Sequence, residues 1–167
     1  MSKPRVGVSA CLLGQPVRYD GASRPHAWIR EVLPHYAQIL PFCPESEAGL
    51  ETPRPAVRLV QLEGENVRIL GVDNPELDVT TVLQQWVEQQ PQYLQTLDAL
   101  IFKSRSPSCG LATTPVFDEK GALLKPDSDG IFAAWVKSRY PNLVLFDDVR
   151  LEDRHGQALF LARLQKG

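Results

Sequence analysis

Residues 5–11 of the chain read Arg-Val-Gly-Val-Ser-Ala-Cys, a short apolar run that ends beside a cysteine. The pattern recurs twice, since the apolar run 38–42 is followed at once by Cys43 and the run 99–103 is followed by Cys109. Short apolar runs bounded by Gly, Pro and Ser predict buried strands. They alternate with helix-like stretches, so the sequence predicts βαβ units, an α/β fold and a largely parallel sheet flanked by helices.

The expected elements follow from the spacing of apolar residues. We expect strands at Arg5–Ser9, Gln38–Phe42, Val57–Val60, Val67–Leu70, Ala99–Lys103 and Leu143–Phe146. We expect helices at Pro25–Leu33, Val79–Leu97, Gly130–Arg139 and Arg154–Gln165. Pro91 lies inside the second helix and should kink it or split it in two.

Length and composition favour one globular domain over residues 1–167. The chain has 18 Lys and Arg against 20 Asp and Glu, a net charge of −2 that argues against broad binding to polymeric nucleic acid. Every apolar run is far shorter than the roughly 18 residues of a membrane span. The apolar stretch between Arg5 and Cys11 is too short for the core of a secretion signal. We therefore expect a cytoplasmic protein without a membrane partner.

The three cysteines, Cys11, Cys43 and Cys109, carry the strongest functional signal. Their odd number argues against a disulfide framework, and their wide spacing argues against a compact zinc finger. All three follow expected parallel strands, and the carboxyl edge of an open α/β sheet is where ligands bind. If these strands are neighbours, the three thiols share one site. The alternative is that each cysteine is a small buried apolar residue.

Three loops carry these cysteines: the first loop (residues 9–21), the second loop (residues 42–55) and the third loop (residues 103–110). Cysteine ligands need nearby positive charge or hydrogen-bond donors. Positive charge could come from four residues of these loops: Arg18, Arg54, Lys103 and Arg105. Hydrogen-bond donors could come from Ser9, Ser106 and Ser108. The alternative is that the arginines are solvated surface residues and that the serines form turns.

Three cysteine ligands leave one coordination position open on a zinc ion, or one iron of a [4Fe-4S] cube without a protein ligand. Such an iron can act as a Lewis acid on a substrate. Glu45 lies two residues from Cys43 and could transfer a proton. Its alternative role is a helix-capping or salt-bridged carboxylate.

The chain resembles the thiouracil desulfurase family in five motifs that occur in the family's order: SACLLG, VRYDG, CPE, GLETPRP and KSRSPSCG. It also resembles the family at Asp78-Val79-Thr80. The resemblance implies a compact Rossmann-like domain with an oxygen-sensitive [4Fe-4S] cluster at the carboxyl ends of the strands. It implies that Cys11, Cys43 and Cys109 are the cluster ligands, and that Glu45 and Ser106 are the catalytic residues.

The resemblance also implies desulfuration of a thiolated pyrimidine without net redox change and with release of hydrogen sulfide. It leaves open whether the substrate is a free base, 2- or 4-thiouracil, or the nucleoside or nucleotide, 4-thiouridine or 4-thio-UMP. We expect five residues of the loops and of the start of the first helix to contact it: Ser9, Arg24, His26, Lys103 and Ser108. The helix after Ser23-Arg24-Pro25-His26 could take a phosphate at its N-terminus, the alternative being an ordinary N-cap. We expect a monomer or a weak dimer.

Three other functions remain open on the residues alone. A zinc hydrolase or deaminase with three cysteine ligands is the nearest enzymatic alternative, although Cys43-Pro44-Glu45 has no later P-C-x-x-C partner. An iron-sulfur or sulfur carrier in tRNA thiolation is a second, and an α/β domain with merely structural cysteines is a third. A P-loop or dinucleotide-binding enzyme does not fit, because neither glycine motif occurs.

Overall fold

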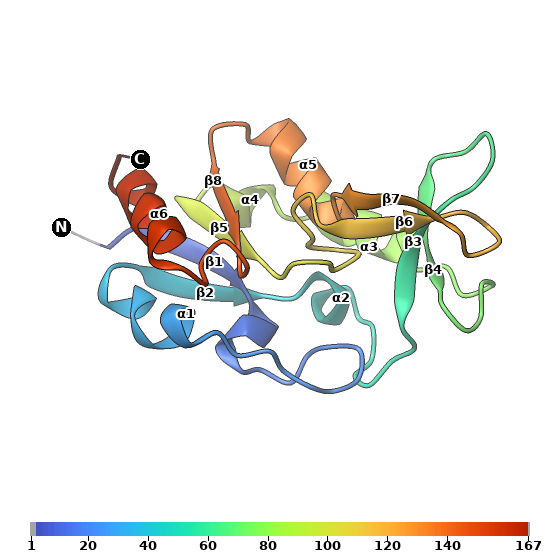
Figure 1. Cartoon of the computed structure of the whole chain (residues 1–167), viewed down its shortest axis with the longest axis horizontal. Coiled ribbons are helices and arrows are strands. Elements are labelled where there is room, and N and C mark those ends of the chain that lie inside the picture. Colours follow the sequence, from blue (N-terminus) through green and yellow to red (C-terminus); the bar gives the residue numbers. More distant parts are fainter. Residues whose placement is uncertain (1–2, 167) are drawn as a thin grey trace.

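The computed structural model describes residues 3–166 and contains two four-stranded sheets (Figure 1). The first sheet has the order β2-β1-β5-β8, and all its pairings are parallel. Its strands are β1 (Arg5–Ser9), β2 (Gln38–Phe42), β5 (Ala99–Phe102) and β8 (Val144–Asp147). The predicted α/β fold with a mostly parallel sheet flanked by helices is confirmed.

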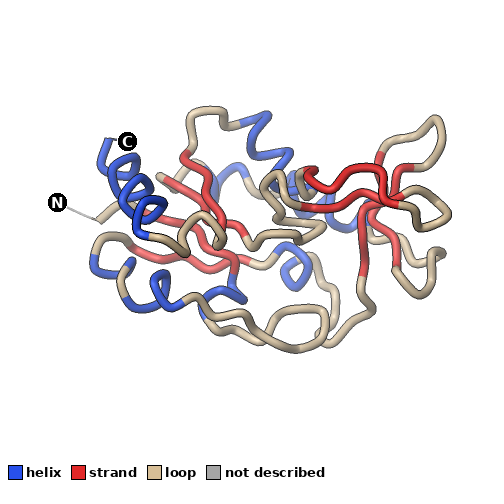
Figure 2. The backbone as a smooth tube through the Cα atoms, in the orientation of Figure 1, coloured by secondary structure: helices blue, strands red, loops and turns tan. Residues whose placement is uncertain are grey.

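The second sheet is smaller and mixed, with the order β4-β3-β6-β7. It consists of β3 (Val57–Gln61), β4 (Val67–Gly71), β6 (Thr114–Phe117) and β7 (Leu123–Ser128). We expected β3 and β4 within the parallel sheet and did not predict β6 and β7. Pro115 and Pro126 interrupt those two runs, and their pairing is irregular, which removes the alternation that marks a strand. Figure 2 shows the two groups of strands separated by loops and short helices.

Helices cover both faces of the parallel sheet. Val6, Val8 and Ile101 pack on one face with α1 (Ala27–Glu31) and α6 (Arg154–Lys166). On the other face, Leu100 and Phe102 pack with three further helices. These are α3 (Thr80–Glu88), α4 (Pro91–Leu94) and α5 (Ile131–Arg139). Because successive strand residues point to opposite faces, the buried strand β5 supplies both cores.

The four expected helices are present, but two of them are interrupted. The expected helix at 79–97 is split into α3 and α4, with Pro91 as the first residue of α4. The expected helix at 25–33 ends as α1 at Glu31 and continues after Val32 as the 3-10 helix η2 (Leu33–His35), where Pro34 cannot extend an α-helix. Two further short helices, η1 (Ala10–Leu13) and α2 (Pro44–Glu47), begin in the loops that follow β1 and β2. Among residues 3–166, no helix is both long enough and apolar enough to cross a bilayer.

Candidate active site

The three cysteines lie on loops that follow three adjacent parallel strands. In the sheet, β1 pairs with β2 on one side and with β5 on the other. Cys11 lies in η1 after β1, Cys43 directly follows β2, and Cys109 lies in the third loop after β5. All three line one cavity with a volume of about 480 Å³. The three strands are thus neighbours, which is the condition that the sequence set for a shared site.

Local interactions hold each cysteine loop in place. The backbone N–H of Cys43 donates to Oε2 of Glu47 at 2.7 Å, which fixes the start of α2. In the third loop, the Ser106 hydroxyl oxygen accepts the backbone N–H groups of Ser108 at 3.1 Å and Cys109 at 3.0 Å. Serine followed by such a turn is a common local pattern, so the loop geometry follows from its sequence.

The third loop is held in place by contacts with the start of α5. The backbone N–H groups of Ile131 and Phe132 donate to the carbonyl oxygens of Pro107 and Ser108 at 2.9 and 2.8 Å. Gly130 packs so closely that an added Cβ atom would lie 2.7 Å from the backbone nitrogen of Cys109. Two segments that are distant in sequence thus fix the position of one cysteine.

Burial dominates the acid-base behaviour of two of the thiols. Burial raises the pKa of Cys11 to about 11, although the charges of Lys103 and Arg18 oppose this shift. Burial also raises the pKa of Cys109 well above its usual value, and the nearby Cys43 raises it further. Both groups are therefore neutral thiols at pH 7 in the absence of a metal, and a bound metal would have to displace their protons.

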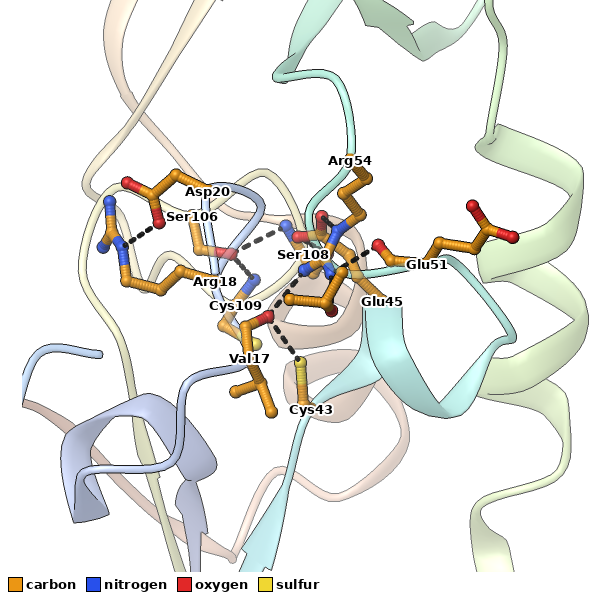
Figure 3. Close-up of polar contacts among 11 residues, drawn as sticks. Val17, Arg18, Asp20, Cys43, Glu45, Glu51, Arg54, Ser106, Ser108 and Cys109 are labelled. Atoms are coloured by element: carbon orange, nitrogen blue, oxygen red, sulfur yellow. Dashed lines mark hydrogen bonds and ion pairs between the residues drawn. The ribbon is translucent and has the colours of Figure 1, made fainter. Parts of the chain in front are cut away.

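Glu45 extends from α2 into the cavity lining and is held at both carboxylate oxygens. Nε of Arg54 donates to Oε1 at 3.1 Å, and the Ser108 hydroxyl donates to Oε2 at 3.1 Å (Figure 3). The ion pair is well shielded, since the side chains of Glu45 and Arg54 are 14% and 8% exposed. Glu45 therefore forms the salt bridge that the sequence left open as its alternative role, and it also lines the cavity.

Five of the seven other residues predicted for catalysis or substrate contact reach the cavity wall, namely Glu45, Ser106, Ser9, Arg24 and Lys103. Lys103 is held by hydrogen bonds from Nζ to the carbonyl and hydroxyl oxygens of Ser104, both at 3.1 Å. Its Nζ also lies 3.4 Å from Oδ2 of Asp148. The ammonium group therefore stands beside Cys11 with its position fixed.

His26 and Ser108 have other roles in the structure. His26 begins α1, where its Nδ1 accepts the backbone N–H of Ile29 at 3.4 Å, and its Nε2 lies 3.1 Å from the carbonyl oxygen of Asp148. The helix start is thus closed by its own side chain, which favours the ordinary N-cap over a phosphate site. Ser108 is 1% exposed, is not among the residues that line the cavity, and donates its hydroxyl hydrogen to Glu45.

The comparisons with known proteins agree with this geometry. A family model described as 2-thiouracil desulfurase matches residues 6–148, which is most of the chain. The chain belongs to the 2-thiouracil desulfurase family. The resemblance drawn from the motifs is confirmed, and with it the expectation that the protein is an enzyme.

One solved structure similar to this desulfurase family member is described as a [4Fe-4S]-dependent thiouracil desulfidase, TudS. It is 30% identical, the TM-score is 0.72, and the match covers 96% of this chain and 99% of that one. The comparison with curated proteins found no match.

The donor set of this desulfurase suits a cluster. Within residues 3–166, no three His, Cys, Asp or Glu side chains are close enough together to hold a single metal ion. A cube differs from a single ion because each cysteine binds a different iron atom, so its ligands stand further apart. Three thiols on three separate loops around one cavity fit that requirement.

The structure adds residues to which the motifs assigned no definite role. Arg18, Tyr19 and Arg105 also line the cavity of this desulfurase. Nε of Arg18 is buried and makes no hydrogen bond within the described part of the chain, while Asp20 lies 3.9 Å away. Arg105 has a φ of 65°, a left-handed conformation that is uncommon outside glycine. The motif VRYDG contained Arg18 and Tyr19, but only the fold shows that they face the cavity.

Proposed function

We propose that this enzyme removes sulfur from a thiolated pyrimidine with a [4Fe-4S] cluster held by Cys11, Cys43 and Cys109. The proposal is supported by the family membership and by the activity stated for the similar solved structure. The observation that carries it is the convergence of three cysteines, from three neighbouring strand ends, on one cavity. When bound, such a cluster supplies an iron without a protein ligand, which is a Lewis acid for the sulfur of a C=S group.

The proposed reaction exchanges sulfur for oxygen without electron transfer. A thiouracil and one water give uracil and hydrogen sulfide, so the oxygen of water becomes the new carbonyl oxygen and the sulfur leaves with two protons. The protein must therefore take a proton from the attacking water and deliver protons to the departing sulfur. These are general acid-base tasks, for which a carboxylate within hydrogen-bond reach is suited.

We assign the proton transfer to Glu45. Each carboxylate oxygen has two lone pairs, and Arg54 and Ser108 together use one on each oxygen. The remaining lone pairs can accept a hydrogen bond from a water in the cavity. Arg54 and Ser108 thus leave the carboxylate free to act while they fix where it points.

Ser106 is assigned to orientation of the substrate. Its oxygen already accepts two backbone N–H groups, so its remaining capacity is to donate its own hydrogen. Ser106 lines the cavity, and no acceptor for this hydrogen is found within residues 3–166. A carbonyl oxygen or ring nitrogen of the pyrimidine would be such an acceptor.

The positive charges around the cavity favour a nucleotide over the free base. Arg18, Arg24, Lys103 and Arg105 all line it, and Nε of Arg18 is an unused buried donor among the described residues. Guanidinium groups bind phosphate oxygens well because their donors match its geometry. We infer that 4-thio-UMP is bound more tightly than 4-thiouridine or 4-thiouracil. Ser9 contributes indirectly, since its hydroxyl oxygen accepts the backbone N–H of Lys103 at 2.9 Å.

Turnover by the reconstituted enzyme alone tests the proposal. The chain is reconstituted without oxygen, incubated with 4-thio-UMP and with 2-thiouracil, and assayed for sulfide and for the oxygenated product. We expect both in equal amounts with no partner protein present. Glu45→Gln should keep its iron and lose turnover, whereas the exposed control Glu88→Gln should retain both. Failure to release sulfide from any thiopyrimidine, despite full iron content, would contradict the proposal and favour a sulfur or cluster carrier.

A further inference from the structure

Arg54 is the most highly connected side chain beside the cavity. Its Nε donates to Oε1 of Glu45 at 3.1 Å, and its Nη2 donates to the carbonyl oxygen of Val17 at 2.9 Å. Its Nη1 donates to the carbonyl oxygen of Glu51 at 3.1 Å and to Oγ1 of Thr52 at 2.8 Å. The guanidinium group therefore ties the first loop to both ends of the second loop (Figure 3).

The contact with Val17 brings Arg54 near a cysteine as well as near Glu45. The same Val17 carbonyl oxygen lies 4.0 Å from Sγ of Cys43, within reach of its thiol. The backbone N–H of Arg54 also donates to the carbonyl oxygen of Tyr19. Arg54 thus holds the backbone of the first loop against the segment that carries both Cys43 and Glu45.

This arrangement depends on the shape of the guanidinium group and not only on its charge. Its donors point to four acceptors in fixed directions, which a lysine ammonium cannot reproduce. The pair is also shielded from water, so removal of one partner leaves the other as an unpaired, mostly buried charge. A carboxylate that has lost this partner turns toward another donor.

We propose that Arg54 is a positioning residue that holds Glu45 in the orientation that desulfuration requires. The inference rests on the proposed function, because it assigns Arg54 a task in that reaction. It does not make Arg54 a catalytic residue, since its donors are directed at protein acceptors. Arg54 acts on the reaction through Glu45 and through the backbone of the first loop.

The test compares Arg54→Met and Arg54→Lys with the wild type, all as cluster-loaded enzymes. Arg68→Met is the matched control, because Arg68 forms a similar two-donor ion pair with Asp78 at 2.9 and 2.7 Å outside the cavity lining. The measurements are iron content, stability, and kcat and KM for 4-thio-UMP.

We expect Arg54→Met to lose roughly 10- to 100-fold in kcat per bound cluster, the effect of one lost hydrogen bond to a charged group. KM should change little, because Arg54 acts on the reaction through the position of Glu45 and not through contact with the substrate. Arg54→Lys should recover part of kcat, and Arg68→Met should match the wild type in kcat and KM. A merely structural role would lower iron content or stability and leave kcat per bound cluster unchanged, and that result would overturn the inference.

Crystal structures of the cluster-loaded variants separate this inference from the proposed function. We expect the Glu45 carboxylate to leave its position in Arg54→Met and to keep it in Arg54→Lys. A Glu45 side chain that stays in place in Arg54→Met overturns the role of Arg54, whatever the activity. If the wild type itself releases no sulfide, the proposed function fails, and the position of Glu45 still decides whether Arg54 holds it.

Discussion

Replacement of Gly130 by alanine should displace the third loop and with it Cys109. An added Cβ atom would lie 2.5 and 2.6 Å from the carbonyl carbon and oxygen of Ser108, and 2.7 Å from the backbone nitrogen of Cys109. The φ of Gly130 is −67°, so alanine is allowed by the backbone and the whole effect is steric. To restore an ordinary contact of about 3.5 Å, the loop must move away by about 1 Å.

A movement of that size exceeds what metal ligation tolerates. Distances from metals to their ligands are reproduced to within about 0.2 Å in working sites. Overpacking of this kind costs about 1–3 kcal/mol, and an alanine N-cap is also less favourable than glycine. A domain with a typical stability of about 5–15 kcal/mol stays folded under that loss. We therefore expect Gly130→Ala to fold and to bind much less iron.

The assay is iron per chain after anaerobic reconstitution, with stability followed by urea denaturation. Gly64→Ala is the control, because Gly64 has a φ of 72° in the turn between β3 and β4 and has no other atoms within 4 Å of an added Cβ. It should lose about 1–2 kcal/mol from left-handed strain and keep its iron. Iron content in Gly130→Ala equal to that of the control would refute the idea that α5 positions Cys109.

Three further predictions concern stability, the third loop and the substrate. Burial raises the pKa of Asp78, but hydrogen bonds from Thr80 and Arg68 outweigh it and lower the pKa below its ordinary value. The ion pair thus stabilises the fold above about pH 4 and is lost as the pH falls through the lowered pKa. Asp78→Asn should cost about 0.5–1 kcal/mol in urea denaturation at pH 7 and much less at pH 3, and an equal cost at both pH values would contradict this. Ser106→Ala removes the acceptor of two backbone N–H groups, so it should cost about 1–3 kcal/mol and reduce iron content, whereas Ser106→Thr should retain both properties. In binding measurements, 4-thio-UMP should have a lower Kd than 4-thiouracil, and equal affinities would remove any role for the arginines of the cavity in phosphate binding.

The sequence was sufficient for the parallel sheet because its strands are short, apolar and bounded by turn residues. The predicted ranges Arg5–Ser9 and Gln38–Phe42 coincide with β1 and β2. Each cysteine follows such a strand, so the order of the chain already placed them at one edge. The sequence predicted β3 and β4 as strands but not the second sheet that they form with β6 and β7. β7 was missed because it is largely exposed and carries Pro126, which does not fit the pattern of a core strand.

The site was harder to predict, because the roles of its polar residues depend on contacts between distant segments. His26 looks like a candidate substrate contact in the sequence, but its second ring nitrogen lies against the carbonyl oxygen of Asp148, 122 residues later. Arg54 was one of several positive residues near the cysteines, and no local pattern distinguished it from Arg105. Only the fold shows that Arg54 is shielded and paired with Glu45, whereas Arg105 is exposed.

The most direct test of the account is the amount of iron and acid-labile sulfide bound per chain after anaerobic reconstitution. We expect about four of each, which is the content of one [4Fe-4S] cube. Cys11→Ser, Cys43→Ser and Cys109→Ser should each lose the cluster, since the three thiols are its proposed ligands. Zinc in place of iron, or no metal after competent reconstitution, would contradict the central claim, and full loading of any one serine variant would remove that cysteine from the ligand set.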